Sequence, residues 1–201
     1  MPHSSIQRTK KGYLVNFNPH YNLVGKHAFL SASQHSWVNY SDDKLAERLV
    51  TSLAAQRGTE MHALASDLIR LKVKLPRNKT TFNSYVNDAI GFKMQPEQVL
   101  YYSDNCFGTA DAILFKEKTN TLRIHDLKTG VSPVSMVQLK IYMSMFCLEY
   151  DIKPHQIESE LRIYQNDDIQ VEPPDPDEIL HLMDKIVTFD KAINKQKMEL
   201  L

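Results

Sequence analysis

The segment GTADAILFKEKTNTLRIHDLKTG, residues 108–130, carries most of the information about the fold of this chain. It contains two runs rich in Ile, Leu and Phe, at 108–115 and 121–127, and the turn-forming Lys118-Thr119-Asn120 separates them. Runs of this length and composition on either side of such a turn are typical of antiparallel strands. The segment therefore predicts a β-hairpin.

Three charged residues lie within or directly after the strands of this hairpin. Asp111 lies in the first strand, Asp126 comes at the end of the second, and Lys128 follows two positions later. Because residues two apart on a strand face the same side, Asp126 and Lys128 point together, and the hairpin would bring Asp111 beside them. Two converging carboxylates suit Mg²⁺ or Mn²⁺, and a neighbouring lysine would orient or deprotonate a water or stabilise charge on a phosphate.

An Asp-x-Lys pair at the end of a strand is also typical of a solvated sheet edge. The setting favours a site, because Asp126 follows the apolar Leu122 and Ile124. Asp111 likewise lies within the small and apolar run 110–113, where an ordinary core strand would avoid a carboxylate.

Outside the hairpin, the chain alternates between helical and strand periodicity. We expect an extended lead-in over residues 1–32 and a single domain over 33–201, with a helical layer at 33–95 and a sheet with helices at 96–201. The expected elements are a short helix over 33–40, a helix capped by Ser41-Asp42-Asp43, a helix opened by Gly58-Thr59 and running to about 71, a helix over 81–92, strands over 98–103, 108–115 and 121–127, a helix over 135–149, strands over 157–164 and 169–171, and a helix over 177–194. This order predicts an α/β (α+β) protein.

The charge balance restricts how this chain would hold a nucleic acid. Lys plus Arg equals Asp plus Glu at 24 each, so the formal net charge is zero. A protein that neutralises many phosphates is normally basic, so any DNA contact must come from a local basic track or from metal ions. The basic residues cluster at Arg8, Lys10 and Lys11, and at Arg70, Lys72, Lys74, Arg77 and Lys79. A solvated tail and loop is the alternative interpretation of both clusters.

The sequence excludes several other classes of protein. No run of about 18 apolar residues is present, so no membrane partner is expected. The amino terminus lacks the apolar core of a secretory signal, and Cys106 and Cys147 are too few for a disulfide framework or a Cys-based zinc site. These features favour a cytoplasmic location. No Walker loop or Gly-x-Ser-x-Gly elbow occurs.

Four motifs, in chain order, resemble the RecB-type branch of the PD-(D/E)xK nuclease superfamily: RGTEMHALA, GTADAI, IHDLKTG and QLKIY. In that branch a helix with a Gly and a metal-binding His precedes a Gly-x-x-Asp strand, an Asp/Glu-x-Lys-Thr-Gly strand and a helix with Gln-x-x-x-Tyr. Gly58 and His62 match the first helix, and Gln138 and Tyr142 match the last. The resemblance spans roughly residues 33–165.

The resemblance implies a restriction-endonuclease-like fold, with a central mixed sheet flanked by helices, and a metal-dependent DNA nuclease, foremost an exonuclease of replication, recombination or repair. The implied metal ligands are the side chains of His62, Asp111 and Asp126 and the backbone carbonyl of Leu127. Lys128 would be the catalytic lysine. Gln138 and Tyr142 would lie at the rim of the site and contact the DNA backbone or support the lysine. Glu60 is an alternative, because some relatives use a carboxylate from this helix; we expect it behind the ligands.

The resemblance also implies cofactors and partners. We expect Mg²⁺ or Mn²⁺ and no iron–sulfur cluster, because Cys106 and Cys147 cannot supply the four cysteines that several relatives use. The substrate would be duplex or single-stranded DNA. A recombination or replication partner protein and a homo-oligomer are further expectations. The compact size suits a phage or mobile-element enzyme acting in the cytoplasm of a bacterial host.

Other interpretations of the same residues stay open at this stage. A non-catalytic DNA-binding or protein-interaction module could keep the nuclease fold, and zero net charge is consistent with it. An RNA-directed enzyme is a third hypothesis. Individually, His62 could be a surface or cap residue, Tyr142 a core residue and Gln138 an exposed helix residue. The sequence does not distinguish exonuclease from endonuclease, or one metal from two.

Overall fold

The computed structural model describes residues 6–9, 12–15 and 19–200, with side chains from residue 19 onward. The chain divides into two compact units, residues 1–52 and 53–201. The predicted division after residue 32 stays a prediction. The basic cluster at Arg8, Lys10 and Lys11 lies outside the residues whose side chains are described.

The first unit is small and consists of short elements before a long helix. The strands β1 (Ile6–Thr9) and β2 (Gly12–Val15) pair in antiparallel register. Two 3₁₀ turns follow, η1 (Tyr21–Leu23) and η2 (His35–Asn39). The helix predicted over 33–40 is therefore a shorter 3₁₀ turn, and Trp37 within it donates a hydrogen bond from Nε1 to the Ser31 carbonyl at 2.8 Å.

The helix α1 (Asp42–Leu71) is continuous, which corrects the prediction that Gly58-Thr59 opens a separate helix. Gly58 is buried in the middle of α1, and a Cβ atom there would lie 2.9 Å from Oγ1 of Thr129. A glycine within a helix costs about 1 kcal/mol relative to alanine. Here it marks a close approach between α1 and the segment after β5, and not a helix boundary.

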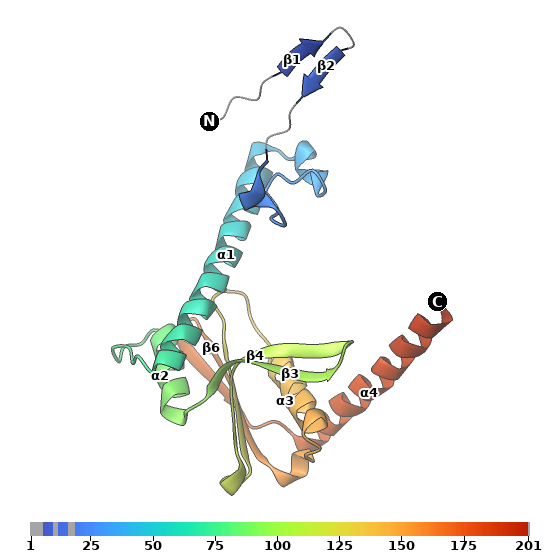
Figure 1. Ribbon diagram of the computed structural model, residues 1–201. Helices are drawn as coiled ribbons and strands as arrows, with labels where there is room; N and C mark the ends of the chain where they lie inside the picture. The colour runs from blue at the N-terminus through green and yellow to red at the C-terminus, as the bar shows by residue number, and fades with distance from the viewer. Residues whose placement is uncertain (1–5, 10–11, 16–18, 201) are drawn as a thin grey trace. The chain divides into compact units, whose positions relative to one another are not determined.

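A five-stranded mixed sheet forms the centre of the second unit, in the order β3-β4-β5-β6-β7 (Figure 1). The strands are β3 (Gln95–Ser103), β4 (Cys106–Lys116), β5 (Thr121–Leu127), β6 (Glu158–Gln165) and β7 (Asp168–Glu172). The pair β5–β6 is parallel and the other pairs are antiparallel. The predicted hairpin is confirmed as β4 and β5, which η3 (Glu117–Thr119) and the left-handed Asn120 connect.

Helices flank this sheet, and the predicted α/β (α+β) class is confirmed at that level. The other helices are α2 (Thr81–Phe92), α3 (Val137–Glu149) and α4 (Pro176–Glu199), with the 3₁₀ turn η4 (Pro154–Gln156) before β6. Leu122 and Ile124 of β5 pack in one apolar cluster with residues of α3 and α4. Leu127 packs in a second cluster with residues of α1 and α2. Because side chains alternate along a strand, these clusters lie on opposite faces of the sheet.

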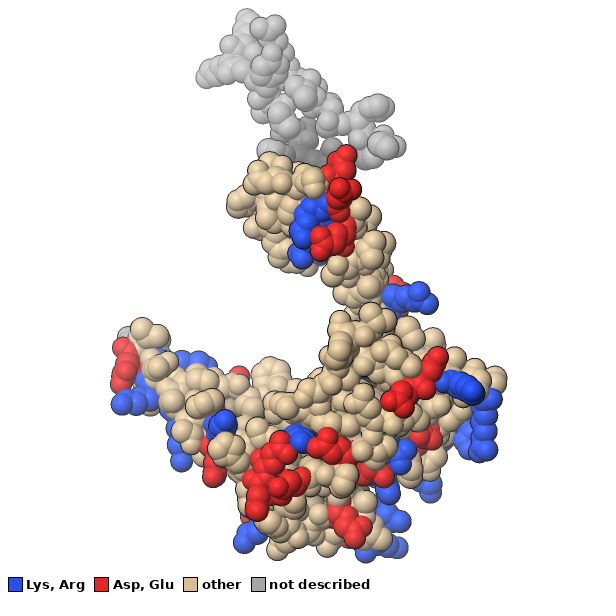
Figure 2. All heavy atoms as spheres, turned by 180° about the vertical axis from the view of Figure 1, so that it is seen from behind, with Lys and Arg blue, Asp and Glu red and all other residues tan. Residues whose placement is uncertain are grey.

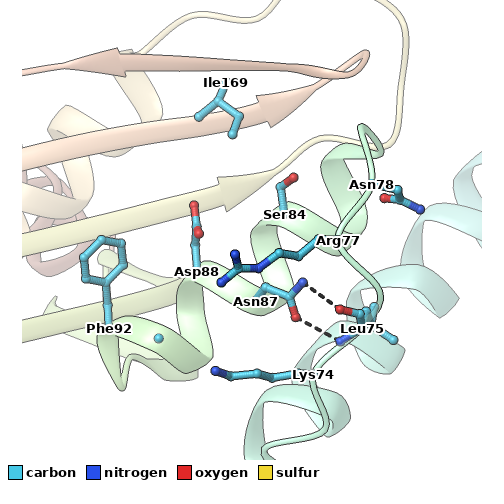
Figure 3. Close-up of a pocket in the computed structure, with 10 residues that line it drawn as sticks. Lys74, Leu75, Arg77, Asn78, Ser84, Asn87, Asp88, Phe92 and Ile169 are labelled. Carbon is cyan, nitrogen blue, oxygen red and sulfur yellow. Dashed lines mark hydrogen bonds between the residues drawn. The ribbon is translucent and has the colours of Figure 1, made fainter.

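The second basic cluster of the sequence begins with Arg70 at the end of α1, and its other members lie in the loop between α1 and α2. The amide of Asn87 in α2 anchors this loop, because it donates to the Leu75 carbonyl and accepts from the Leu75 N–H, each at 2.9 Å (Figure 3). Lys74 and Arg77 line a cavity of about 540 Å³ beside Asp88. Lys and Arg side chains also gather at the right-hand edge of Figure 2, where this connection lies. The loop is therefore held by α2 and presents its cations at the surface.

Candidate metal centre

The candidate site begins with two aspartates on neighbouring strands. Ala112 of β4 pairs with His125 of β5, and the next step of this antiparallel register sets Asp111 opposite Asp126. Residues opposite each other on antiparallel strands share a face of the sheet. His125 faces the other side, where its ring packs against Phe92 and Tyr164.

Asp111 is held in place by the backbone and faces a histidine of α1. Its Oδ2 accepts a hydrogen bond from the Leu127 N–H at 2.8 Å and lies 3.3 Å from Nδ1 of His62. The hydrogen bond with Asp111 raises the pKa of His62, against the lowering effect of its partial burial. Gly58 lies one helical turn before His62, and its missing Cβ lets α1 run close to Thr129. This spacing accounts physically for the Gly-x-x-x-His motif.

Asp126 is buried, with 1% of its surface exposed. Its Oδ1 accepts a hydrogen bond from Lys128 Nζ at 3.1 Å. Its Oδ2 lies 3.0 Å from the same nitrogen but has no hydrogen bond of acceptable geometry among the described residues. Burial, followed by repulsion from Asp111, raises the pKa of Asp126 to about 6, although Lys128 opposes the shift. A buried carboxylate in this state is costly without a further cation, and a divalent ion would offset that cost.

Lys128 begins a chain of polar contacts that reaches α3. Its ammonium donates to Asp126 and, at 2.7 Å, to Oε1 of Gln138. Gln138 in turn donates from Nε2 to the Tyr142 hydroxyl at 3.1 Å. The ring of Tyr142 lies against Gly108, where an added Cβ would be 3.0 Å from Cε1. Four residues that the motifs predicted to lie near one another are therefore linked.

The side chains of two predicted site residues, Glu60 and Leu127, take no part in these contacts. Glu60 does not join the cluster: it is exposed on α1 and accepts a hydrogen bond from Gln56 at 3.0 Å. Glu60 is two residues from His62 on the helix and so points away from it. A supporting role for Glu60 behind the ligands stays a prediction. Leu127 contributes its N–H to Asp111, and its side chain packs in the core. A role for its carbonyl stays a prediction.

One acidic residue that the motifs did not indicate lies at the site. Glu97 of β3 supplies an oxygen that, with ligand atoms of His62 and Asp111, forms a group within 4.8 Å of one another. Burial, followed by repulsion from Asp111, raises the pKa of Glu97. The sequence signal was absent because the strand was predicted to begin at 98, and only strand pairing sets Glu97 beside Asp111.

The donor set fits a hard divalent cation. Carboxylate oxygens are the ligands that Mg²⁺ and Mn²⁺ prefer, and imidazole is a common further ligand of first-row transition metals. The buried Oδ2 of Asp126 is a carboxylate oxygen that no hydrogen bond occupies among the described residues. This arrangement can bind a cation and present a lysine ammonium beside it.

Comparison with known proteins adds no relative. No protein-family model, no curated protein and no solved structure matches this chain. Within the part of the chain that the structure describes, no helix is both long and apolar enough to cross a membrane.

Proposed function

We propose that this protein is a metal-dependent nuclease of the PD-(D/E)xK type, similar to the RecB branch, which hydrolyses phosphodiester bonds in DNA. The observation that carries the proposal is the convergence of Asp111, Asp126 and Lys128 with His62 from a distant helix. These four residues match the family's motifs in order and type. An exonuclease of replication, recombination or repair, encoded by a phage or mobile element and acting in the host cytoplasm, is the form of the proposal that the resemblance favours.

The residues divide the work of hydrolysis between them. His62, Asp111, Asp126 and the Leu127 carbonyl would hold Mg²⁺ or Mn²⁺. Such an ion, when bound, polarises a phosphoryl oxygen and favours ionisation of a bound water. Lys128 has three ammonium protons. Two are directed to Asp126 and Gln138, so one is left for a phosphate oxygen or the attacking water.

Gln138 and Tyr142 position the lysine in this proposal. Gln138 uses its carbonyl oxygen to bind Lys128 and its amide nitrogen to bind the Tyr142 hydroxyl, so its orientation is set from both ends. The side chain of Gln138 is also exposed, which gives it access to a DNA backbone. Both roles that the resemblance implies for this residue are compatible with its position.

A local basic surface supports DNA as the substrate despite zero net charge. Three cations from the ends of α1 and α2 line a cavity of about 550 Å³ that includes Pro96, the neighbour of Glu97: Arg70, Lys72 and Lys93. Lys74 and Arg77 continue the basic surface along the α1–α2 loop. Lys and Arg side chains grouped beside the candidate metal centre fit a polyanionic substrate better than the same charges spread over the molecule.

The test of this proposal is cleavage of DNA by the purified protein in Mn²⁺ and Mg²⁺. Asp111→Asn and Lys128→Met should each lower the rate by at least about a hundredfold. Glu60→Gln is the matched control on α1, because this carboxylate lies outside the cluster, and it should cleave at the wild-type rate. Wild-type activity of Asp111→Asn in Mn²⁺ would refute the assignment.

The same assay separates the remaining alternatives. Linear DNA with free ends, compared with DNA closed by hairpins, distinguishes an exonuclease from an endonuclease. Parallel single-stranded DNA and RNA substrates test the RNA-directed alternative. A non-catalytic binding module, which zero net charge favours, would cleave none of them and would show no thermal stabilisation by Mn²⁺.

A further inference from the structure

Gln165 is a buried polar residue at the end of β6, and none of the four motifs includes it. Only 6% of its surface is exposed. Its side-chain nitrogen donates to two backbone carbonyls, that of Gly130 at 2.6 Å and that of Ser132 at 2.9 Å. A side-chain amide has two N–H donors, so these two bonds use both. Both acceptors lie in the segment between β5 and α3, 35 and 33 positions earlier in the chain.

This segment, residues 128–136, connects two members of the candidate site. Lys128 directly follows β5, and Gln138 lies in the first turn of α3. Their side chains meet, because the Lys128 ammonium donates to Oε1 of Gln138 at 2.7 Å. The path of the segment therefore sets how closely the lysine and the glutamine approach each other.

The backbone of β6 supports only the beginning of the segment. The Lys128 N–H donates to the Tyr164 carbonyl at 2.9 Å, which continues the parallel pairing one step beyond β5. The strand β6 ends at Gln165, and Asn166 and Asp167, both with positive φ, turn the chain back into β7. The Gln165 side chain thus takes over where the backbone hydrogen bonds between the two strands stop.

The residues that Gln165 holds have little apolar support. Gly130, Val131 and Ser132 are exposed, and 84% of the Val131 surface is open to solvent. Few buried apolar contacts hold residues of this kind, so hydrogen bonds from a buried side chain have a large share in fixing their position.

We propose that Gln165 is a positioning residue for Lys128: its amide fixes the segment after β5 and thereby keeps the lysine ammonium in contact with Gln138. The inference rests on the proposed function, because it gives Gln165 a part in the same hydrolysis. Gln165 does not touch the substrate in this proposal. The side chains proposed as metal ligands lie on α1, β4 and β5, outside the segment, so the loss of Gln165 should affect the lysine and not the binding of the ion.

The test compares Gln165→Met with the wild type in steady-state cleavage of DNA at saturating Mn²⁺. Methionine is unbranched and apolar, so it fills the buried position but donates to neither carbonyl. The two carbonyls belong to exposed residues and can accept from water instead, so the variant should fold. The kcat should fall at least about tenfold, whereas the KM for DNA and the Mn²⁺ affinity from calorimetry should stay within about twofold. Gln170→Met is the matched control, because Gln170 is exposed on β7, and it should keep the wild-type kcat.

A double-mutant cycle separates positioning from a general loss of stability. If Gln165 acts by keeping Lys128 in contact with Gln138, Gln165→Met should lower kcat by less than about threefold once Gln138→Leu has removed that contact. A merely structural role would lower kcat by the same factor in both backgrounds. That result, or a wild-type kcat in Gln165→Met, would overturn the proposal.

Hydrogen exchange provides a measurement that does not depend on cleavage. The amides of residues 128–136 should exchange faster in Gln165→Met than in the wild type, and those of β4 and β5 should not change. Unchanged exchange in the segment would overturn the proposal even if kcat fell. A wild type that cleaves no DNA would instead refute the nuclease assignment, and with it the catalytic purpose of Gln165, while the exchange rates would still decide whether Gln165 holds the segment.

Discussion

The substitution Asp126→Asn should stabilise the metal-free protein while it destroys the site. The pKa of Asp126 is about 6 in the folded protein against an ordinary 3.8, mainly because the group is buried. At about 1.4 kcal/mol for each pKa unit, the charged form costs the folded state about 3 kcal/mol at pH 8. An amide of the same shape removes that cost, although it is itself a buried polar group. We therefore expect a gain of about 2–3 kcal/mol.

The sign of the pH dependence follows from the raised pKa. Above pH 6 the folded wild type holds a buried charge, and its stability increases as the pH falls from about 6 towards 3.8, because the folded state then binds the proton more tightly. Asn cannot titrate, so the advantage of Asp126→Asn should be largest at pH 8 and fall below about 1 kcal/mol at pH 4.

The assay is urea denaturation with EDTA, followed by circular dichroism. Tryptophan fluorescence would report on the wrong unit, because the single tryptophan, Trp37, lies within residues 1–52. In a parallel thermal melt followed by the same signal, the midpoint of unfolding should rise by roughly 5–10 °C at pH 8. Asp67→Asn is the matched control, because Asp67 is exposed on α1 and lies 3.9 Å from Arg70; it should change little.

Addition of Mn²⁺ should reverse the order of stability. The wild type should gain stability in proportion to the logarithm of the free ion concentration, and Asp126→Asn should gain little. If metal-free Asp126→Asn were less stable than the wild type at pH 8, the argument that this carboxylate is buried at a cost and awaits a cation would be refuted.

Three further predictions concern the surroundings of the site. Gly108→Ala should lower the cleavage rate more than the stability, because a Cβ 3.0 Å from the Tyr142 ring shifts the residue that supports Gln138; a rate equal to the wild type would contradict this. In the Asp126→Asn background, the free energy of unfolding should fall by about 2 kcal/mol between pH 7.5 and 5 in urea titrations. Burial lowers the pKa of His125 to about 3, so in this pH range only the unfolded state binds a proton at this residue. The additional change His125→Phe should remove this pH dependence. Lys72→Glu should weaken DNA binding several-fold at low salt and much less at high salt in a fluorescence anisotropy titration; an equal effect at both would argue against a phosphate contact.

Several elements were predictable from local patterns. The strand at 121–127 and the helix at 81–92 have the bounds that their periodicity predicted, because side-chain alternation and turn residues act over a few neighbouring positions. The pairing of Asp126 with Lys128 was also predictable, because Lys128 directly follows the strand that carries Asp126 and residues two apart in extended chain share a face. The motifs further indicated that His62 and Gln138 belong with them.

The prediction at Gly58 failed for an instructive reason. A glycine inside a helical pattern is locally indistinguishable from a boundary, but α1 continues through Gly58. The glycine is there because the Thr129 side chain occupies the space that a Cβ would fill. That requirement comes from a segment 71 positions further along the chain, as the two residue numbers show. Local periodicity contains no information about it.

Glu97 shows most clearly what tertiary structure adds. Nothing in its local sequence distinguishes it from an exposed acid before a strand, and its φ of +51° and its place opposite Asp111 exist only once β3 pairs with β4. Residue types and their spacing indicated the chemistry of the site, because the direction of side chains repeats every few residues along a helix or strand. The membership of the site was decided by strand register and by the approach of α1, because these bring together groups that are distant in the chain.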